Sequence, residues 1–205
     1  MIDILPQETA LLVIDPQNDY CHPEGILAMS GVDVSVWNET TPKIAELIKV
    51  CQAAGIRDIW TRHYNYADDQ GRAQKRLKPH TAKRKTVTAQ PGSWGSEFVD
   101  ELKPLIGEKS NVVDKYRFSA FYGTTLETLL EIFGTKLLII CGGTTNACVD
   151  TTIRDAYIRN YDIVIVEDCI AGIRKDWHEM AVQVWKQYLG EIVKLDDLPG
   201  LIKKA

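Results

Sequence analysis

Six short runs of apolar and β-branched residues recur along the chain and are separated by stretches with a helical pattern. The runs are residues 10–14, 56–61, 111–113, 137–141, 162–166 and 191–195. Runs that are apolar at nearly every position are typical of strands covered on both faces, and helices between successive strands allow those strands to run parallel. The pattern therefore predicts a three-layer α/β/α sandwich around a six-stranded parallel sheet, of the Rossmann-like class.

Four of the intervening segments carry apolar residues at a spacing near that of an α-helix. The first is expected to begin at Thr41-Pro42, as N-cap and first-turn proline, and to end at Gly55. The other helices are expected over residues 124–134, 146–157 and 176–188, with Asn146 and Asp176 as N-caps.

Length and composition limit the classes of protein that the chain can belong to. The 205 residues suit one domain spanning 1–205, and 28 acidic against 24 basic side chains give a net charge of -4, so nucleic acid is a poor partner. No stretch is long and apolar enough for a membrane span or a secretion signal. Five cysteines without a C-x-x-C pair fit a reducing compartment better than a disulfide framework or a zinc site. We expect a soluble, cytoplasmic protein with no membrane partner.

A long polar stretch without a clear period extends from residue 62 to residue 95 and contains a basic cluster at 75–85. Loops of this length inside a compact domain are usually functional or disordered. A substrate lid, a contact between subunits and a simple solvated loop all remain open for it.

Three side chains with reactive functional groups follow predicted strands. Asp15 follows the first strand, Lys115 the third and Cys148 the fourth. Because ligands bind at the carboxyl ends of parallel strands, a carboxylate, an ammonium and a thiol are expected at one edge of the sheet.

Cys148 is the most informative of the cysteines. With Asn146 as N-cap, its thiol falls in the first helical turn, where free N–H groups favour a thiolate and hence a nucleophile. The alternative is a small buried apolar residue. The four histidines, His22, His63, His80 and His178, are placed in loops or near a helix start. Asp15 is therefore the candidate base and Lys115 the ammonium beside it, although a turn residue before Pro16 and a solvated charge are the simpler interpretations.

Three motifs together resemble one known family. They are LLVIDPQNDY at 11–20, DKYRFSAF at 114–121, and GGTTNACV at 142–149 with Thr152, Arg154, Asp155 and Ala156 following. In this order and spacing, which covers residues 9–195, the sequence resembles the isochorismatase-like cysteine hydrolases.

The resemblance implies a set of roles and a set of partners. Cys148 is implied as the nucleophile, Asp15 as its general base and Lys115 as the third member of the triad. A cis peptide bond between Gly143 and Thr144 is implied, with the backbone N–H groups of Thr144 and Cys148 as the oxyanion hole. Homodimers or homotetramers are also implied, and the candidate interface residues are Trp37, Trp177 and residues 64–90.

The family includes nicotinamidases, isochorismatases that cleave a vinyl ether, and amidases acting on carbamoyl, ureido or maleamate-type compounds. Nicotinamidases usually carry Asp-x-His and a further histidine for a metal after the second strand, whereas this chain has TRHYN at 61–65. His63 is therefore interpreted as an ordinary loop residue, and neither a metal nor an organic cofactor is expected. Since Cys148 favours acyl transfer, we predict hydrolysis of a C–N bond in a small amide, carbamoyl or ureido substrate. Nicotinamidase and isochorismatase activities are the alternatives.

Candidate substrate-binding residues are those near the triad in the sequence and one downstream arginine. They are Gln17, Tyr20, Trp94, Phe121 and Arg174. Core packing is the alternative for the first four, and a solvated surface position is the alternative for Arg174, which could otherwise bind a substrate carboxylate. A dinucleotide-binding domain would need glycines after the first strand, where Asp15-Pro16-Gln17-Asn18 has none. A non-catalytic interaction protein is disfavoured because all three triad residues are present.

Overall fold

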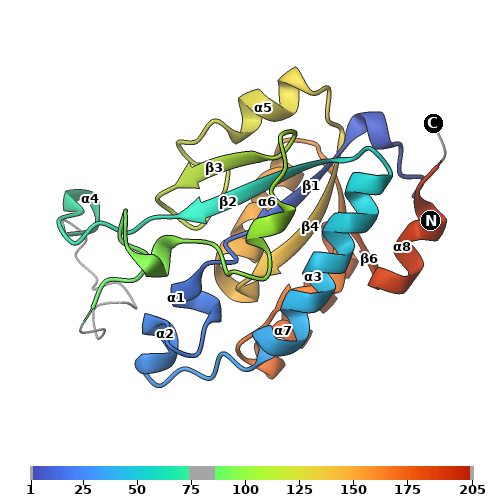
Figure 1. The fold of residues 1–205 in the computed structure, drawn as a ribbon. Coiled ribbons are helices and arrows are strands. Elements are labelled where there is room, and N and C mark those ends of the chain that lie inside the picture. Colours follow the sequence, from blue (N-terminus) through green and yellow to red (C-terminus); the bar gives the residue numbers. More distant parts are fainter. Residues whose placement is uncertain (1, 74–85, 204–205) are drawn as a thin grey trace.

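The computed structural model describes residues 2–73 and 86–203, and its centre is a six-stranded sheet with every pairing parallel (Figure 1). The strand order is β3-β2-β1-β4-β5-β6. The strands are β1 Thr9–Ile14, β2 Arg57–His63, β3 Asn111–Lys115, β4 Leu137–Gly143, β5 Asp162–Ala171 and β6 Glu191–Val193. All six predicted strands and the α/β/α class are confirmed, and the main differences are that β2, β3, β4 and β5 continue further than predicted at their carboxyl ends.

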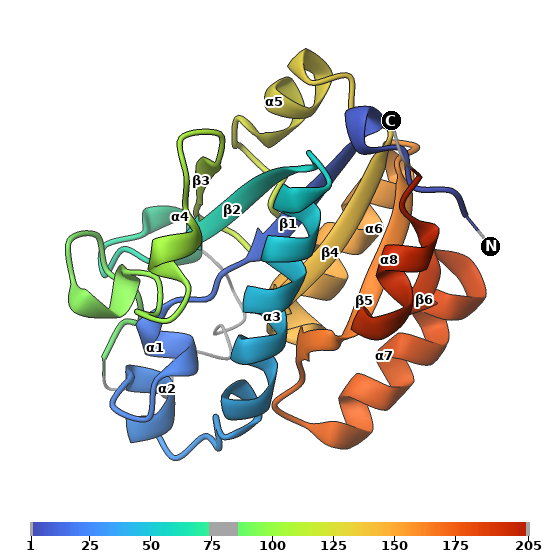
Figure 2. The same ribbon diagram turned by 45° about the vertical axis from the view of Figure 1, so that its right-hand side comes forward.

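Helices cover both faces of the sheet, with α3 on one side and α6 on the other (Figure 2). The α-helices are α1 Asn18–Cys21, α2 Ile26–Met29, α3 Val36–Ala53, α4 Gln70–Ala73, α5 Leu126–Ile132, α6 Asp150–Ile158, α7 Lys175–Tyr188 and α8 Leu198–Leu201. One apolar core joins the sheet to α3 and α8, and a second joins it to α5, α6 and α7. Along β1 and β4, successive residues enter the two cores in turn, as the two-residue period of a strand requires.

The predicted start of α3 at Thr41-Pro42 is wrong, because the helix begins at Val36 and Pro42 lies inside it. Trp37 is only 2% exposed and packs into the core between α3 and the sheet, and Thr40 Oγ1 donates a hydrogen bond to the Val36 carbonyl. Burial of the indole therefore stabilises an extra turn ahead of the proline. It also removes Trp37 from the candidates for a subunit interface.

The other predicted helix starts need smaller corrections. A π-helical turn, Thr145–Val149, precedes α6, so Asn146 lies within the turn and is not an N-cap. Helix α7 begins at Lys175 after an extended Arg174, which puts Asp176 in its first turn.

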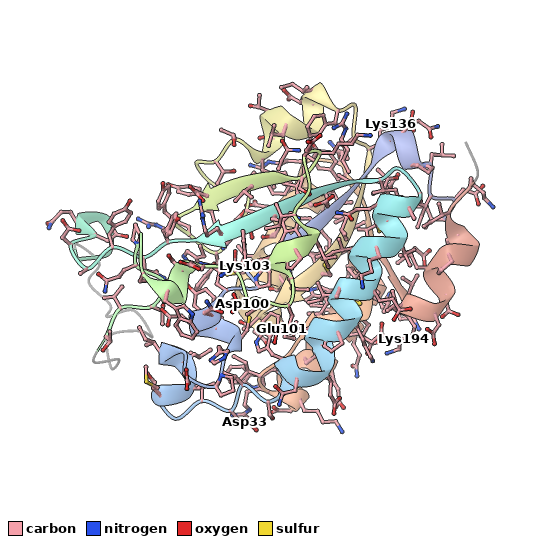
Figure 3. The ribbon with its side chains drawn as sticks, viewed as in Figure 1. Asp33, Asp100, Glu101, Lys103, Lys136 and Lys194 are labelled. Carbon is pink, nitrogen blue, oxygen red and sulfur yellow. The ribbon has the colours of Figure 1, made fainter. Side chains whose placement is uncertain are left out.

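The charged side chains that Figure 3 labels lie on the outside of this fold, away from the two cores. Figure 3 labels Lys103 and Asp100, whose charged atoms are 2.8 Å apart, and Lys136 and Lys194 at other places on the surface. Within the described ranges, no helix is both long and apolar enough to cross a membrane. The basic cluster at 75–85, within the 62–95 stretch, lies outside the described residues.

Candidate active site

The carboxyl ends of β1, β2 and β3 and the turn after β4 meet at one edge of the sheet. Residue pairing sets their relative heights: Ile14 lies beside both Thr61 and Gly142, and His63 lies beside Lys115. Asp15 follows Ile14 directly. This is the edge at which parallel α/β sheets bind ligands, and the arrowheads of β2 and β3 mark it in Figure 1.

Lys115 lies at the centre of the candidate site and bridges the other two members of the expected triad. Its Nζ is 2.8 Å from Asp15 Oδ2 and 3.2 Å from Cys148 Sγ. The same nitrogen donates to the carbonyls of Arg117 and Phe118, at 3.0 and 3.1 Å. Lys115 and Asp15 are 0% and 1% exposed, and Cys148 is 6% exposed. The three side chains are therefore in direct contact, as the resemblance implies.

The four oxygen and sulfur acceptors around Lys115 require a donor with all its protons. Burial disfavours the charged amine, but the Asp15 carboxylate and the Cys148 sulfur outweigh burial and raise the pKa of Lys115 above its ordinary value. Lys115 is thus an ammonium that can stabilise negative charge but cannot accept a proton at neutral pH.

The Asp15 carboxylate is held from a second side by Thr61. Thr61 Oγ1 donates to Asp15 Oδ1 at 2.6 Å and accepts a hydrogen bond from the Asp15 backbone N–H at 3.2 Å. Asp15 has a φ of 49°, in the left-handed region that residues other than glycine seldom adopt. The carboxylate is therefore fixed in position beside the ammonium and the thiol.

The environment of Cys148 favours the neutral thiol in the resting protein. Burial raises the pKa of Cys148, the Asp15 carboxylate raises it further, and Lys115 lowers it. The expectation that the helical turn alone favours a thiolate is thus corrected, because burial has the larger effect. A base is needed to remove the proton, and Asp15 is adjacent.

Two glycines allow the turn that carries Cys148 to approach its neighbours closely. Gly142 has a φ of 110°, and a Cβ there would lie 2.2 Å from the Ile14 carbonyl oxygen. At Gly143 a Cβ would lie 2.4 Å from Trp37 Cζ2. The peptide bond between Gly143 and Thr144 is cis, as the resemblance implies.

His63 is the site residue that the sequence interpretation missed. It is the last residue of β2 rather than a loop residue, it is 4% exposed, and its Nδ1 lies 3.8 Å from Cys148 Sγ. The predicted strand ended at Thr61, two residues too early. Continuing the strand to His63 would have placed the imidazole at the same edge as Lys115.

Gln17 has a structural role that differs from the one expected. Its side-chain amide donates to the carbonyls of His63 and Ser96, at 3.1 and 3.0 Å, and accepts from the His63 N–H at 2.7 Å. The side chain is 0% exposed. Because its amide is committed to the backbone, Gln17 holds the end of β2 and is not available to bind substrate.

Tyr20 is the one candidate substrate-binding residue with evidence of proximity to the triad. Its hydroxyl accepts a hydrogen bond from Asn65 Nδ2 at 3.1 Å. Burial raises the pKa of Tyr20, and the nearby Asp15 and Cys148 raise it further. The phenol therefore stays neutral and lies within electrostatic range of Asp15 and Cys148.

Phe121, Trp94 and Arg174 have contacts of other kinds. Phe121 is buried in the core between the sheet and α5, α6 and α7, where its ring stacks on Tyr161 at 5.9 Å, so it is a packing residue rather than a pocket wall. Trp94 is 45% exposed and packs edge-on against His22, and Arg174 is an exposed residue paired with Asp176 at 2.8 Å.

Asp15, His63 and Cys148 also offer donor atoms that lie within 4.8 Å of one another, a spacing that a metal ion could bridge. The Lys115 ammonium, however, lies 2.8 Å from one of these donors and 3.2 Å from another. A cation bound there would meet that charge at short range, so the donor set does not fit a resident metal ion. The expected absence of a metal stays a prediction.

Comparison with known proteins gives matches over nearly the whole chain. The family model described as "Isochorismatase domain" matches residues 9–197. Ureidoacrylate amidohydrolase RutB of Pantoea ananatis (strain LMG 20103) is 35% identical over 179 residues, which cover 82% of this chain and 70% of that protein.

Solved structures with the same fold include three of interest. A cysteine hydrolase from Pseudomonas syringae pv. phaseolicola 1448A has a TM-score of 0.83 and 24% identity, covering 98% of this chain and 95% of that one. N-carbamoylsarcosine amidase from Thermoplasma acidophilum has a TM-score of 0.73 and 26% identity, covering 92% and 97%. Nicotinamidase PncA from Bacillus subtilis has a TM-score of 0.76 and 25% identity, covering 91% and 99%. With these matches the resemblance noted in the sequence is confirmed: the chain is a hydrolase and belongs to the isochorismatase domain family.

Proposed function

We propose that the protein hydrolyses a C–N bond of a small amide, carbamoyl or ureido compound through a thioester formed on Cys148. The observation that carries the proposal is the buried contact of one ammonium with a carboxylate and a thiol, at 2.8 and 3.2 Å from Lys115 Nζ. The similarity to a ureidoacrylate amidohydrolase, at 35% identity, and to an N-carbamoylsarcosine amidase supports the choice of bond.

The first half of the reaction forms the thioester. Asp15 takes the proton of the Cys148 thiol, and the thiolate, stabilised by the Lys115 ammonium, attacks the substrate carbonyl carbon. The protonated Asp15 then gives its proton to the departing nitrogen as the C–N bond breaks. Asp15 is thereby a carboxylate again, and the acyl group is bonded to sulfur.

The second half of the reaction returns the enzyme to its starting state. Asp15 accepts a proton from a water molecule, whose oxygen attacks the thioester carbonyl. As the C–S bond breaks, Asp15 returns that proton to the sulfur, which restores the thiol and the carboxylate. In both halves the carbonyl oxygen becomes negative. The backbone N–H groups of Thr144 and Cys148 are proposed to stabilise it, and each such donor is typically worth about 3 kcal/mol.

A panel of small amides, carbamoyl and ureido acids, nicotinamide and isochorismate tests the proposal. Ammonia release from a ureido or carbamoyl compound by the unmodified protein is expected, with none from Cys148→Ala. Cys51→Ala, which removes a buried thiol from α3, serves as the matched control and should retain turnover. Ammonia from no amide, together with pyruvate from isochorismate, would overturn the C–N assignment, and near-normal activity of Cys148→Ala would overturn the mechanism.

Nicotinamide hydrolysis is the second candidate, because nicotinamidase PncA from Bacillus subtilis shares the fold at 25% identity. Two observations count against it. The donor set around Cys148 does not fit a metal ion, as argued above. In addition, Asn65 Nδ2, in the segment after β2, is hydrogen-bonded to Tyr20 and Thr88. This side chain is therefore committed to contacts within the protein. Strong turnover of nicotinamide with none of ureido acids would reverse this ranking.

Self-association into a homodimer or homotetramer is also proposed. Trp177, Met180 and Tyr188 on α7 are 53%, 68% and 68% exposed, which leaves large apolar side chains in solvent. Light scattering should report a particle of at least twice the 23.1 kDa of the chain. A particle of monomer mass over a wide range of concentration would contradict this.

A further inference from the structure

One buried polar residue beside the nucleophile has no part in the reaction as written above. We propose that His63 is a fourth catalytic residue, which donates a hydrogen bond from Nδ1 to the Cys148 sulfur and stabilises the thiolate together with Lys115. The inference rests on the proposed function, in which Cys148 is the nucleophile.

The backbone of His63 is fixed from two directions. In the sheet it lies beside Lys115, so the two residues leave adjacent strands at the same height. From the other side, the Gln17 amide accepts from the His63 N–H at 2.7 Å and donates to its carbonyl at 3.1 Å. Because a buried glutamine uses both ends of its amide on the backbone of one residue, it fixes the backbone position from which that residue's side chain extends.

The imidazole ring is confined as well as its backbone. Its centroid lies 6.2 Å from that of Tyr20 and 6.2 Å from that of Phe118, the latter in an edge-to-face arrangement. The Nδ1 atom lies 3.8 Å from Cys148 Sγ, within the longer reach of a hydrogen bond to sulfur. The Tyr20 and Phe118 rings, together with the Gln17 amide on the backbone, thus support the orientation of His63 toward the thiol.

The polar side chains around the Cys148 sulfur explain why a second hydrogen-bond donor to the thiolate is useful. Asp15 approaches it from the position directly after β1, His63 from β2, Lys115 from β3 and Tyr20 from α1. Lys115 gives two of its three protons to the carbonyls of Arg117 and Phe118, which leaves one to share between Asp15 and the sulfur. When the thiol proton moves to Asp15, the sulfur becomes a buried anion with only that shared donor, and His63 supplies another without losing its own proton.

Two substitutions of His63 separate this role from a purely structural one. His63→Leu replaces the imidazole by an apolar side chain of similar size and so removes the hydrogen-bond donor. His63→Asn keeps a donor at the δ position, because Asn Nδ2 and His Nδ1 are the same number of bonds from Cα. His22→Leu is the control, since His22 is a histidine that packs on Trp94 and accepts a hydrogen bond from the Glu24 N–H.

The decisive assay is the rate of Cys148 alkylation by iodoacetamide between pH 6 and 9, read by mass spectrometry with Cys148→Ala as the background. Because burial raises the pKa of the Cys148 thiol, this range lies below its midpoint, where the rate is proportional to the thiolate fraction. A hydrogen bond to an anion corresponds to about a 10- to 100-fold effect. His63→Leu should therefore alkylate at least about tenfold more slowly at each pH, with a similar loss of kcat/KM, and His63→Asn should recover most of both.

Alkylation and kcat/KM of His63→Leu within twofold of the unmodified protein would overturn the inference, as would a folded His63→Asn that is no better than His63→Leu. Circular dichroism establishes which variants are folded. If His63→Leu does not fold, the comparison is between His63→Asn and His63→Gln, which holds its amide one bond further out and should alkylate more slowly. Alkylation needs no substrate, so failure to find an amide substrate would count against the proposed function and leave this test intact.

Discussion

Replacing Lys115 by methionine keeps an unbranched chain of similar length and removes the charge at the centre of the site. The carboxylate of Asp15, 1% exposed, then retains Thr61 as a donor but loses the ammonium at 2.8 Å. The carbonyls of Arg117 and Phe118 lose their shared donor as well. Breaking a buried ion pair from one side typically costs about 3–5 kcal/mol, because one charge is left uncompensated. We therefore expect the free energy of unfolding to fall by about that amount.

Catalysis should fall for a related reason. Lys115 lowers the pKa of Cys148, so its removal leaves burial and Asp15 to raise that pKa further and decreases the thiolate available for attack. A loss in kcat of roughly 100-fold or more is expected, in the range typical of a proton-transfer partner. Steady-state kinetics and urea unfolding measure the two effects separately. The double variant Asp15→Asn/Lys115→Met, in which neither charge remains, should be more stable than Lys115→Met alone. Unchanged kinetics and unchanged stability of Lys115→Met would refute the reasoning.

Three further changes have defined outcomes. Thr61→Val removes the donor to Asp15 Oδ1 at similar volume, so kcat/KM should fall about 10- to 100-fold with an unchanged circular dichroism spectrum. Gly143→Ala would place a Cβ 2.4 Å from the Trp37 ring, and urea unfolding should report a loss of about 1–3 kcal/mol. Burial raises the pKa of Cys51 from 9.0 to about 12, so its contribution to stability is complete below pH 9.0 and is lost as the pH rises toward about 12. Cys51→Ala should reduce the pH dependence of the unfolding free energy in this range by up to about 1.4 kcal/mol per pH unit.

Much of the architecture could be predicted because buried parallel strands have an unusually clear pattern. The runs at 10–14 and 137–141 are apolar at every position since both faces of β1 and β4 are covered. Polar residues directly after such runs then mark the ligand-binding edge. This is why Asp15, Lys115 and Cys148 could be selected before their contacts were known.

The residues that were misassigned are those whose environment is set by contacts distant in sequence. His63 follows Arg62, a half-exposed residue paired with Asp114 of the next strand, so the apolar run appears to end before β2 does. Gln17 lies in a polar loop motif, but its partners are the backbones of His63 and Ser96, and no local pattern indicates them. Trp37 lies ahead of a helix-breaking proline in the sequence, and its burial against the sheet stabilises the extra turn.

The geometry of the triad depends on a break in strand alternation at Asp15. Ile14 and Ile59 enter the core on the side of α5, α6 and α7, so the two-residue period points Thr61 and, through its pairing with His63, Lys115 to that same side. A regular strand would turn Asp15 to the opposite face. The left-handed φ of 49° ends the alternation at this residue, and its carboxylate contacts both Thr61 and Lys115. Such a conformation costs a non-glycine residue about 1–3 kcal/mol, and the hydrogen bonds and ion pair of the carboxylate offset that cost. The placement of the Asp15, Lys115 and Cys148 side chains on one side of the sheet therefore depends on one backbone dihedral angle, which hydrophobic periodicity cannot encode.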